Sequence, residues 1–198
     1  MIRPAKTIVL GLTDPRQALE VGLLGVDAVV VQVGGAGPCA LEPVAATAVA
    51  TVLPPLAIRL AWLPAGGELP PGFHGAVTAP EAPVPVGAGL RIVRIDAEFT
   101  EFDPLPDDAR AAWVPPRVAG TSSATRFDFA RIERLSRRVR PILEIPDGAG
   151  GVETAIRLGR PYAVLFADAV WFRPGIIDLD RLEKALGVVA RLNKGAFD

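Results

Sequence analysis

Four carboxylates lie at or near the ends of apolar or amphipathic segments, where α/β proteins commonly place reactive groups. They are Asp128, Glu144, Asp147 and Asp168. A cluster of carboxylates suits a cationic or metal-bound substrate, and carboxyls held at different pKa values act as general acid and general base. Glu144 lies inside an apolar segment, so it either points into the core or marks an exposed face.

Structural roles explain some of the same positions. Asp128 follows a polar loop and opens an amphipathic segment, which is typical of a helix N-cap. Gly148, Gly150 and Gly151 predict either an anion-binding nest at the start of a helix or a flexible turn. The sequence leaves both alternatives open.

His74 and Cys39 are the only histidine and the only cysteine. His74 lies in a Pro/Gly-rich loop, so we expect a surface residue, with a ligand or acid-base role as the alternative. Because neither has a second His or Cys to pair with, we expect no metal site and no cofactor. A single cysteine also excludes an internal disulfide and fits a reducing compartment.

Length and charge narrow the class of protein. The 198 residues predict one domain, 1–198, with a sizeable core. The net charge is −1 and no block of like charge is present, so the sequence does not predict a basic surface that would bind nucleic acid. The densest basic stretch, 126–140, is typical of the polar face of a helix. No apolar run approaches the ~18 residues of a membrane span, so we expect a cytoplasmic protein without a membrane partner.

Strands and helices alternate along most of the chain, which predicts βαβ units and a parallel sheet. Short, nearly continuous apolar segments predict strands at 7–12, 28–33, 56–62, 75–79, 90–97, 111–114, 141–145 and 162–167. Amphipathic segments predict helices at 14–24, 41–52, 127–138, 151–158 and 178–192.

The segments that follow the third, fourth and fifth strands cannot be good helices. Residues 64–71 and 80–89 each contain three prolines and two glycines, and 98–110 contains two prolines. Charges within these strands agree, because a strand covered on both faces should not carry them; they are Arg59, Arg91 and Arg94. We therefore predict an α/β (βα)8 TIM-type barrel with helices 3–5 reduced or replaced by loops.

Several short motifs, in order, resemble the phosphoribosylanthranilate isomerase family over almost the whole chain. The family writes Lys-x-Cys-Gly-x-Thr in its first strand, where this chain has Ile-Val-Leu-Gly-Leu-Thr at 8–13. Further matching segments are 11–14, 17–19, 25–28, 160–164 and 174–178, and Phe-Asp-Phe at 127–129 stands for the family's Phe-Asp-Trp. The resemblance implies a (βα)8 barrel that catalyses an Amadori rearrangement in tryptophan biosynthesis.

The resemblance implies one acid and one base on either side of the substrate. Asp128 occupies the position of the acid, but Leu10 stands where the family has its basic cysteine. Since general base catalysis contributes ~10²–10⁴-fold, we expect this change alone to cripple turnover. Cys39 facing the barrel mouth would be an alternative thiol.

The family's phosphate site, after strands seven and eight, is also altered. Pro146 removes one amide donor, and Asp168 places a carboxylate where a dianion would bind. The candidate ligand contacts at this mouth are Gly120, Thr121, Ser122, Asp147, Gly148 and Asp168, with a solvated loop as the alternative for 120–123. Trp171 and Phe172 predict either packing over the barrel mouth or a contact surface.

Three functions remain open. The first, which we favour, is a non-catalytic descendant of the isomerase, a pseudoenzyme that acts as a subunit or binding module. It would form a homo- or hetero-oligomer through the side of strands three to five. A small molecule at the barrel mouth would be a further ligand. The second is an enzyme with altered chemistry that uses Asp128 and the neighbouring carboxylates. The third is a still active isomerase.

Overall fold

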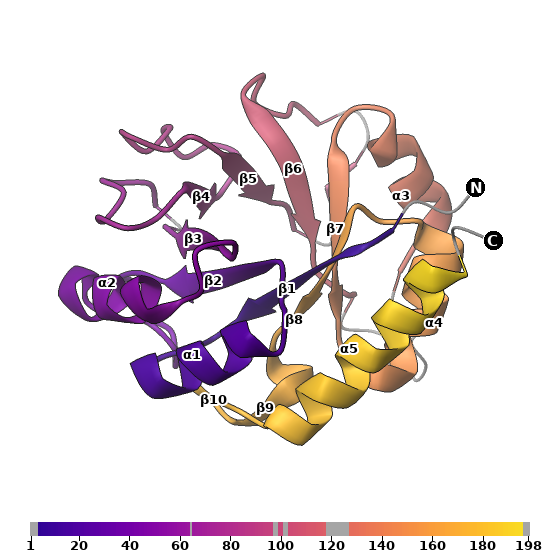
Figure 1. Ribbon diagram of the computed structural model, residues 1–198. Coiled ribbons are helices and arrows are strands. Elements are labelled where there is room, and N and C mark those ends of the chain that lie inside the picture. The colour runs from indigo at the N-terminus through magenta and orange to yellow at the C-terminus, as the bar shows by residue number, and fades with distance from the viewer. Residues whose placement is uncertain (1–3, 64, 97–98, 101–102, 118–126, 196–198) are drawn as a thin grey trace.

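Eight parallel strands close into a barrel (Figure 1). The computed structural model describes residues 4–63, 65–96, 99–100, 103–117 and 127–195. The barrel strands are β1 (Lys6–Leu10), β2 (Ala28–Gln32), β3 (Ile58–Trp62), β4 (Gly75–Thr78), β5 (Arg91–Arg94), β6 (Ala109–Val114), β7 (Arg140–Ile145) and β8 (Ala163–Phe166). Each strand pairs with the next, and β8 pairs with β1, so the predicted barrel is confirmed.

The helices lie where the amphipathic pattern predicts them. They are α1 (Pro15–Leu23), α2 (Pro43–Val52), α3 (Phe129–Ser136), α4 (Ala149–Gly159) and α5 (Leu179–Lys194). The side chains of Asp14, Asp128 and Asp178 accept amide hydrogen bonds in the first turns of α1, α3 and α5 at 2.8, 3.0 and 3.1 Å. None of the described helices is both long enough and apolar enough to cross a bilayer.

The chain after β8 contains elements that the sequence did not predict. A short 3-10 turn, η2 (Asp168–Val170), leads into an antiparallel hairpin of β9 (Trp171–Arg173) and β10 (Ile176–Ile177). The hairpin is too short to produce a periodic pattern, and its Trp and Phe resemble an extension of the apolar strand before it.

Side chains alternate between the inside of the barrel and its coat. Ile8, Leu10 and Val30 belong to a buried cluster inside the barrel. Val9 and Val29, which point the other way, belong to a second cluster between the strands and the helices. The register, in which Leu10 pairs with Val30, therefore directs the Leu10 side chain into the barrel.

No helix follows β3, β4 or β5 within the described stretches between β3 and β6 (Figure 1). The outer faces of these strands are nevertheless buried. Ala61 and Ala76 are fully buried, and Phe73 and Phe99 from the connecting loops belong to the same outer cluster. Small residues on the strands allow irregular backbone to approach them closely. The outer face of β3 to β5 is therefore buried although no helix covers it.

Arg91 explains how the loops are held on this side. It is only 5% exposed. Its Nη1 pairs with Asp108 at 3.0 Å, and its Nη2 donates to the backbone oxygen of Ala82 at 2.7 Å. The expectation that charges in these strands lie on an exposed wall is therefore wrong for Arg91, which is a buried tie between the loops before and after β5.

Candidate functional site

Leu10 ends β1 at the barrel mouth, the end where the carboxyl ends of the strands meet and where barrel enzymes place their active sites. The side chain is buried in the cluster inside the barrel. The base position implied by the motif resemblance is thus held by an aliphatic group with no proton to exchange.

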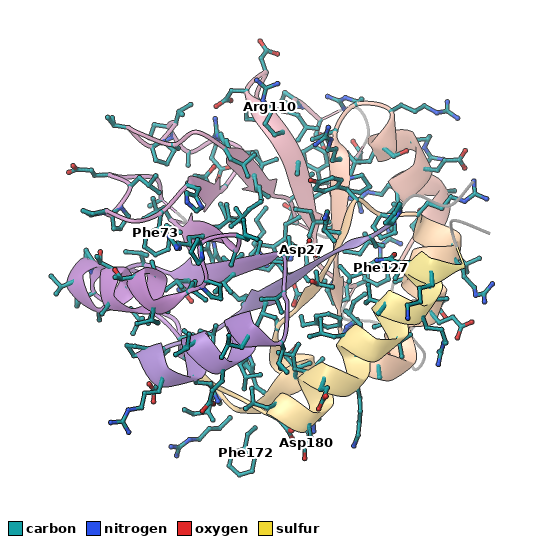
Figure 2. The ribbon with its side chains drawn as sticks, viewed as in Figure 1. Asp27, Phe73, Arg110, Phe127, Phe172 and Asp180 are labelled. Atoms are coloured by element: carbon teal, nitrogen blue, oxygen red, sulfur yellow. The ribbon has the colours of Figure 1, made fainter. Side chains whose placement is uncertain are left out.

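Trp171 covers the exit of β1. Its indole Nε1 donates a hydrogen bond to the backbone oxygen of Leu10 at 2.9 Å. Gly11 makes room for the ring, because a Cβ at this position would lie 2.4 Å from an indole carbon, and its φ of +101° also favours glycine. Packing of Trp171 over the mouth is therefore confirmed, whereas Phe172 is 76% exposed and points away from the barrel (Figure 2).

Asp128 acts as a structural cap in this structure. Its carboxylate accepts the amide hydrogen of Arg131 at 3.0 Å, which satisfies a free donor in the first turn of α3. The helix N-cap that the sequence predicts at Asp128 is thus confirmed. Gly120, Thr121 and Ser122, which precede it, lie outside the described residues.

Glu144 points into the barrel mouth rather than to an exposed face. The indole Nε1 of Trp113 donates to its Oε2 at 2.8 Å. Burial raises the pKa of the Glu144 carboxyl above its usual range, against the opposing effects of the Trp113 hydrogen bond and the positive charge of Arg94, and the charge of Asp168 raises it further. A carboxyl in this state holds its proton longer than a solvated one and can serve as an acid.

Arg94, on the next-but-one strand, completes this cluster. Its Cζ lies 5.1 Å from the ring centroid of Trp113 and 5.7 Å from that of Trp62, and the two rings meet edge to face at 5.3 Å. Its Nε is buried and has no hydrogen-bond partner among the described residues. The guanidinium is thus held by aromatic faces and retains a free donor.

The other two carboxylates, Asp147 and Asp168, lie at the protein surface outside the cluster of Glu144, Trp113 and Arg94. Asp168 is exposed at the start of η2, and it affects Glu144 through its charge. Asp147 is exposed just before α4, whose N-cap is Gly148 at a φ of 55° without a side-chain cap. Their role as ligand contacts stays a prediction.

Two cavities open at this end of the barrel. One of about 280 Å³ is lined by Leu10, Gln32, Cys39, Trp62 and Trp171, among others. A larger one of about 860 Å³ lies over the loops after β4 and β5 and includes the side chain of Arg94. The larger one is within the range of about 300–1,000 Å³ that small-molecule sites occupy, and the smaller one is just below it.

Cys39 shares the smaller cavity with Leu10, as the alternative from the sequence proposed. Burial raises the pKa of its thiol, although a hydrogen bond from the backbone of Gly175 opposes this. The thiol is therefore neutral at ordinary pH and a poor base.

The described side chains were also compared with the ligand sets that metal ions require. Among the described residues, no three His, Cys, Asp or Glu side chains come together as a metal site would require. His74 is exposed, and its Nδ1 accepts the backbone amide hydrogen of Arg59 at 3.1 Å, which joins the ends of β3 and β4.

The aromatic and cationic part of the mouth was not identified from the sequence. Trp62, Arg94 and Trp113 come from β3, β5 and β6, which are far apart in the chain. One available signal was that each ends, or nearly ends, a strand, and so belongs to the mouth of a barrel.

Comparison with known proteins finds structural neighbours only. Neither a protein-family model nor a curated protein sequence matches the chain. Phosphoribosyl anthranilate isomerase from Thermus thermophilus is 22% identical with a TM-score of 0.75, over 94% of this chain and 99% of that one. TrpF from Jonesia denitrificans is 16% identical with a TM-score of 0.76, over 96% and 98%.

A third structure carries a ligand. It is a phosphoribosyl anthranilate isomerase in complex with reduced 1-(o-carboxyphenylamino)-1-deoxyribulose 5-phosphate, 18% identical with a TM-score of 0.70, over 94% of this chain and 99% of that one. At such identities the likeness shows the fold. The resemblance predicted from the motifs is confirmed at that level: the chain is a (βα)8 barrel similar to phosphoribosylanthranilate isomerases over nearly its whole length.

Proposed function

We propose that this chain is an isomerase-like barrel without isomerase activity, which acts as a binding module or as a subunit of an assembly. The observation that carries the proposal is that Leu10 is buried inside the barrel beneath the indole of Trp171, at the position where the motif resemblance implies a base. An Amadori rearrangement needs an acid and a base that face each other across the sugar.

Neither Asp128 nor Cys39 replaces the missing base. The carboxylate of Asp128 is engaged by the amide of Arg131. Cys39 lines the cavity of Leu10, but its raised pKa leaves it without the thiolate that would act as a base. Loss of general base catalysis alone removes about 10²–10⁴-fold of rate.

Retention of a ligand is supported by the mouth itself. Two cavities open there, and Arg94 lines the larger of them, where its guanidinium can meet an acceptor group of a ligand. A structural neighbour binds a small anionic molecule, a phosphate ester that also bears a carboxyl group. We therefore expect a small ligand with an acceptor group to bind beside Arg94.

A subunit role is supported by exposed apolar residues on the loop after β4. Val84 and Val86 are 51% and 80% exposed there, on the side without helices. One neighbour is described as monomers generated from a dimeric isomerase. We expect an oligomer at micromolar concentration in light scattering, and Val86→Glu should shift it towards monomer; a monodisperse wild-type monomer would contradict this part of the proposal.

The test of the proposal as a whole is genetic. A bacterial strain that lacks phosphoribosylanthranilate isomerase needs tryptophan, and the Thermus thermophilus enzyme serves as the positive control. We expect the present chain, expressed to the same level, to give no growth without tryptophan. Growth that depends on Asp128 would overturn the proposal.

A second candidate is an enzyme with altered acid-base chemistry at the same mouth. The observation that favours it is Glu144, a largely buried carboxyl with a raised pKa near the cation of Arg94, which itself lines the larger cavity. Carboxyl-selective NMR titration, with Glu144→Gln to assign the signal, tests it. An ordinary pKa for Glu144 would remove its main support.

A further inference from the structure

A third cavity, of about 230 Å³, lies at the opposite end of the barrel from the mouth. It opens between the amino ends of the strands. Its inner wall is apolar and is formed by Ile8, Ala28, Leu60, Ile92, Ala111 and Ile142. This site is separate from the proposed function, which concerns the mouth.

Small side chains explain why the barrel is hollow here. Bulky branched residues usually fill the interior layers of such barrels. This chain places Ala28 on β2 and Ala111 on β6, both buried in the cluster inside the barrel. Leu60 and Ile142, from the same cluster, limit the depth of the cavity.

The rim of the cavity is cationic. Three cations, Lys6, Arg110 and Arg140, line it against one carboxylate, Asp27. Lys6 is paired with Asp27 at 2.8 Å. Arg110 and Arg140, by contrast, have no carboxylate partner within the described part of the chain, so the rim carries an excess of two positive charges.

The geometry of the rim also orders one of these cations. The Cζ of Arg140 lies 4.9 Å from the ring centroid of Tyr162, a cation–π contact that holds the guanidinium over the opening. Arg110 stands near the start of β6, and Asp27 just before β2 (Figure 2). Leu56 extends the apolar surface at the edge and is 96% exposed.

We propose that this cavity binds a small amphipathic monocarboxylate, with its apolar chain between Ala28 and Ala111 and its carboxylate at Arg110 and Arg140. An engineered apolar cavity of about 150 Å³ holds benzene, so a cavity of about 230 Å³ has room for roughly nine carbon-sized groups. An alkyl chain of about eight carbons fits this volume. Guanidinium groups bind carboxylates with paired, charge-assisted hydrogen bonds.

Calorimetry and NMR with octanoate, octanol and octylamine test the proposal, each below the concentration at which it forms micelles. We expect octanoate to bind and to shift the signals of Ala28, Ala111 and Arg140. Octanol should bind at least about tenfold more weakly, because it cannot make the charge-assisted contact. Octylamine should not bind, and hexanoate should lose about fourfold in affinity for each missing methylene.

Two kinds of variant separate the parts of the site. Ala111→Leu fills the cavity and leaves the rim, and Arg140→Gln removes a charge and leaves the cavity; each should weaken octanoate binding at least about tenfold. Arg137→Gln, at an exposed arginine directly after α3, is the matched control and should bind as wild type does. Circular dichroism confirms folding, and Ala28→Leu replaces Ala111→Leu if the latter does not fold.

Three results would overturn the proposal: no binding of octanoate to the wild-type protein, equal binding of octanoate and octanol, or chemical shifts confined to the mouth. None of them bears on the isomerase test, because that test concerns the other end of the barrel.

Discussion

The indole nitrogen of Trp171 lies 2.9 Å from the backbone oxygen of Leu10, and this hydrogen bond joins the end of β1 to the hairpin that follows β8. The ring also occupies the space that a side chain at Gly11 would need. The contact therefore covers the end of β1 at Leu10 with an element that sequence patterns did not reveal.

Removing the indole donor should weaken the fold slightly. Trp171→Phe loses the bond to Leu10 and should lower the free energy of unfolding by about 1 kcal/mol or more, depending on the packing lost. Gly11→Ala should cost about 1–2 kcal/mol for its backbone conformation and more for the collision with the indole. In a double-mutant cycle, Gly11→Ala should cost less in a Trp171→Ala background, with a coupling of about 0.5–3 kcal/mol. Additive costs would contradict the contact.

The cap at Asp128 can be compared with a matched cap on α5. Asp178 accepts the amide of Arg181 at 3.1 Å, much as Asp128 accepts that of Arg131 at 3.0 Å. Asp128→Ala and Asp178→Ala should each cost about 1 kcal/mol in urea unfolding, because each leaves the same donor unsatisfied. A stabilising effect of Asp128→Ala alone would instead indicate a residue kept for function at the expense of stability.

Arg91 should matter far more than an exposed arginine. Arg91→Met leaves Asp108 and the loop oxygens without their donor, and we expect a loss of about 3 kcal/mol in the free energy of unfolding. Limited proteolysis should then cut within residues 79–90. Arg137→Met is the control and should change stability by less than about 0.5 kcal/mol. Equal effects of the two variants would show that Arg91 does not hold the loops.

Glu144 should make stability depend on pH in a definite direction. Because its pKa is raised in the folded protein, the unfolded chain loses this proton first as the pH rises above about 4.3. The free energy of unfolding therefore falls between that pH and the raised pKa, and the loss persists above it. Glu144→Gln should remove this part of the decline, so that the variant gains on wild type as the pH rises above about 4.3.

The matched control for this pH dependence is Glu133→Gln, which changes an exposed carboxylate on α3. It should follow the wild-type profile within experimental error. Identical profiles for wild type and Glu144→Gln would show that the carboxyl is not perturbed as described.

Much of the fold was predictable because the signals are local. Apolar runs, amphipathic spacing and the caps Asp14 and Asp128 mark the strands and helices, and the prolines of 64–71 and 80–89 exclude helices there. The sequence did not show, however, whether the outer faces of β3 to β5 would be exposed or covered, because that depends on contacts between distant segments. Whether loops can cover β3 to β5 depends on how closely backbone packs against Ala61 and Ala76, which no pattern states.

At the barrel mouth, the sequence predicted only those features that lie within a motif of the resembled family. The absence of an ionisable side chain at Leu10 follows from one aligned position. The cluster of Trp62, Arg94 and Trp113 depends on the register of three strands, and the cavity beneath Ala111 depends on which residues share a layer. Both are properties of the closed barrel, so the spacing of residues along the chain does not contain them.

The most direct measurement of the central claim is turnover of phosphoribosylanthranilate by the purified protein at stoichiometric concentration. We expect no ring-opened product above the uncatalysed rate, for wild type and for Cys39→Ser alike. Product formation that Asp128→Ala or Cys39→Ser abolishes would contradict the account, because it would show a working acid and base on either side of Leu10.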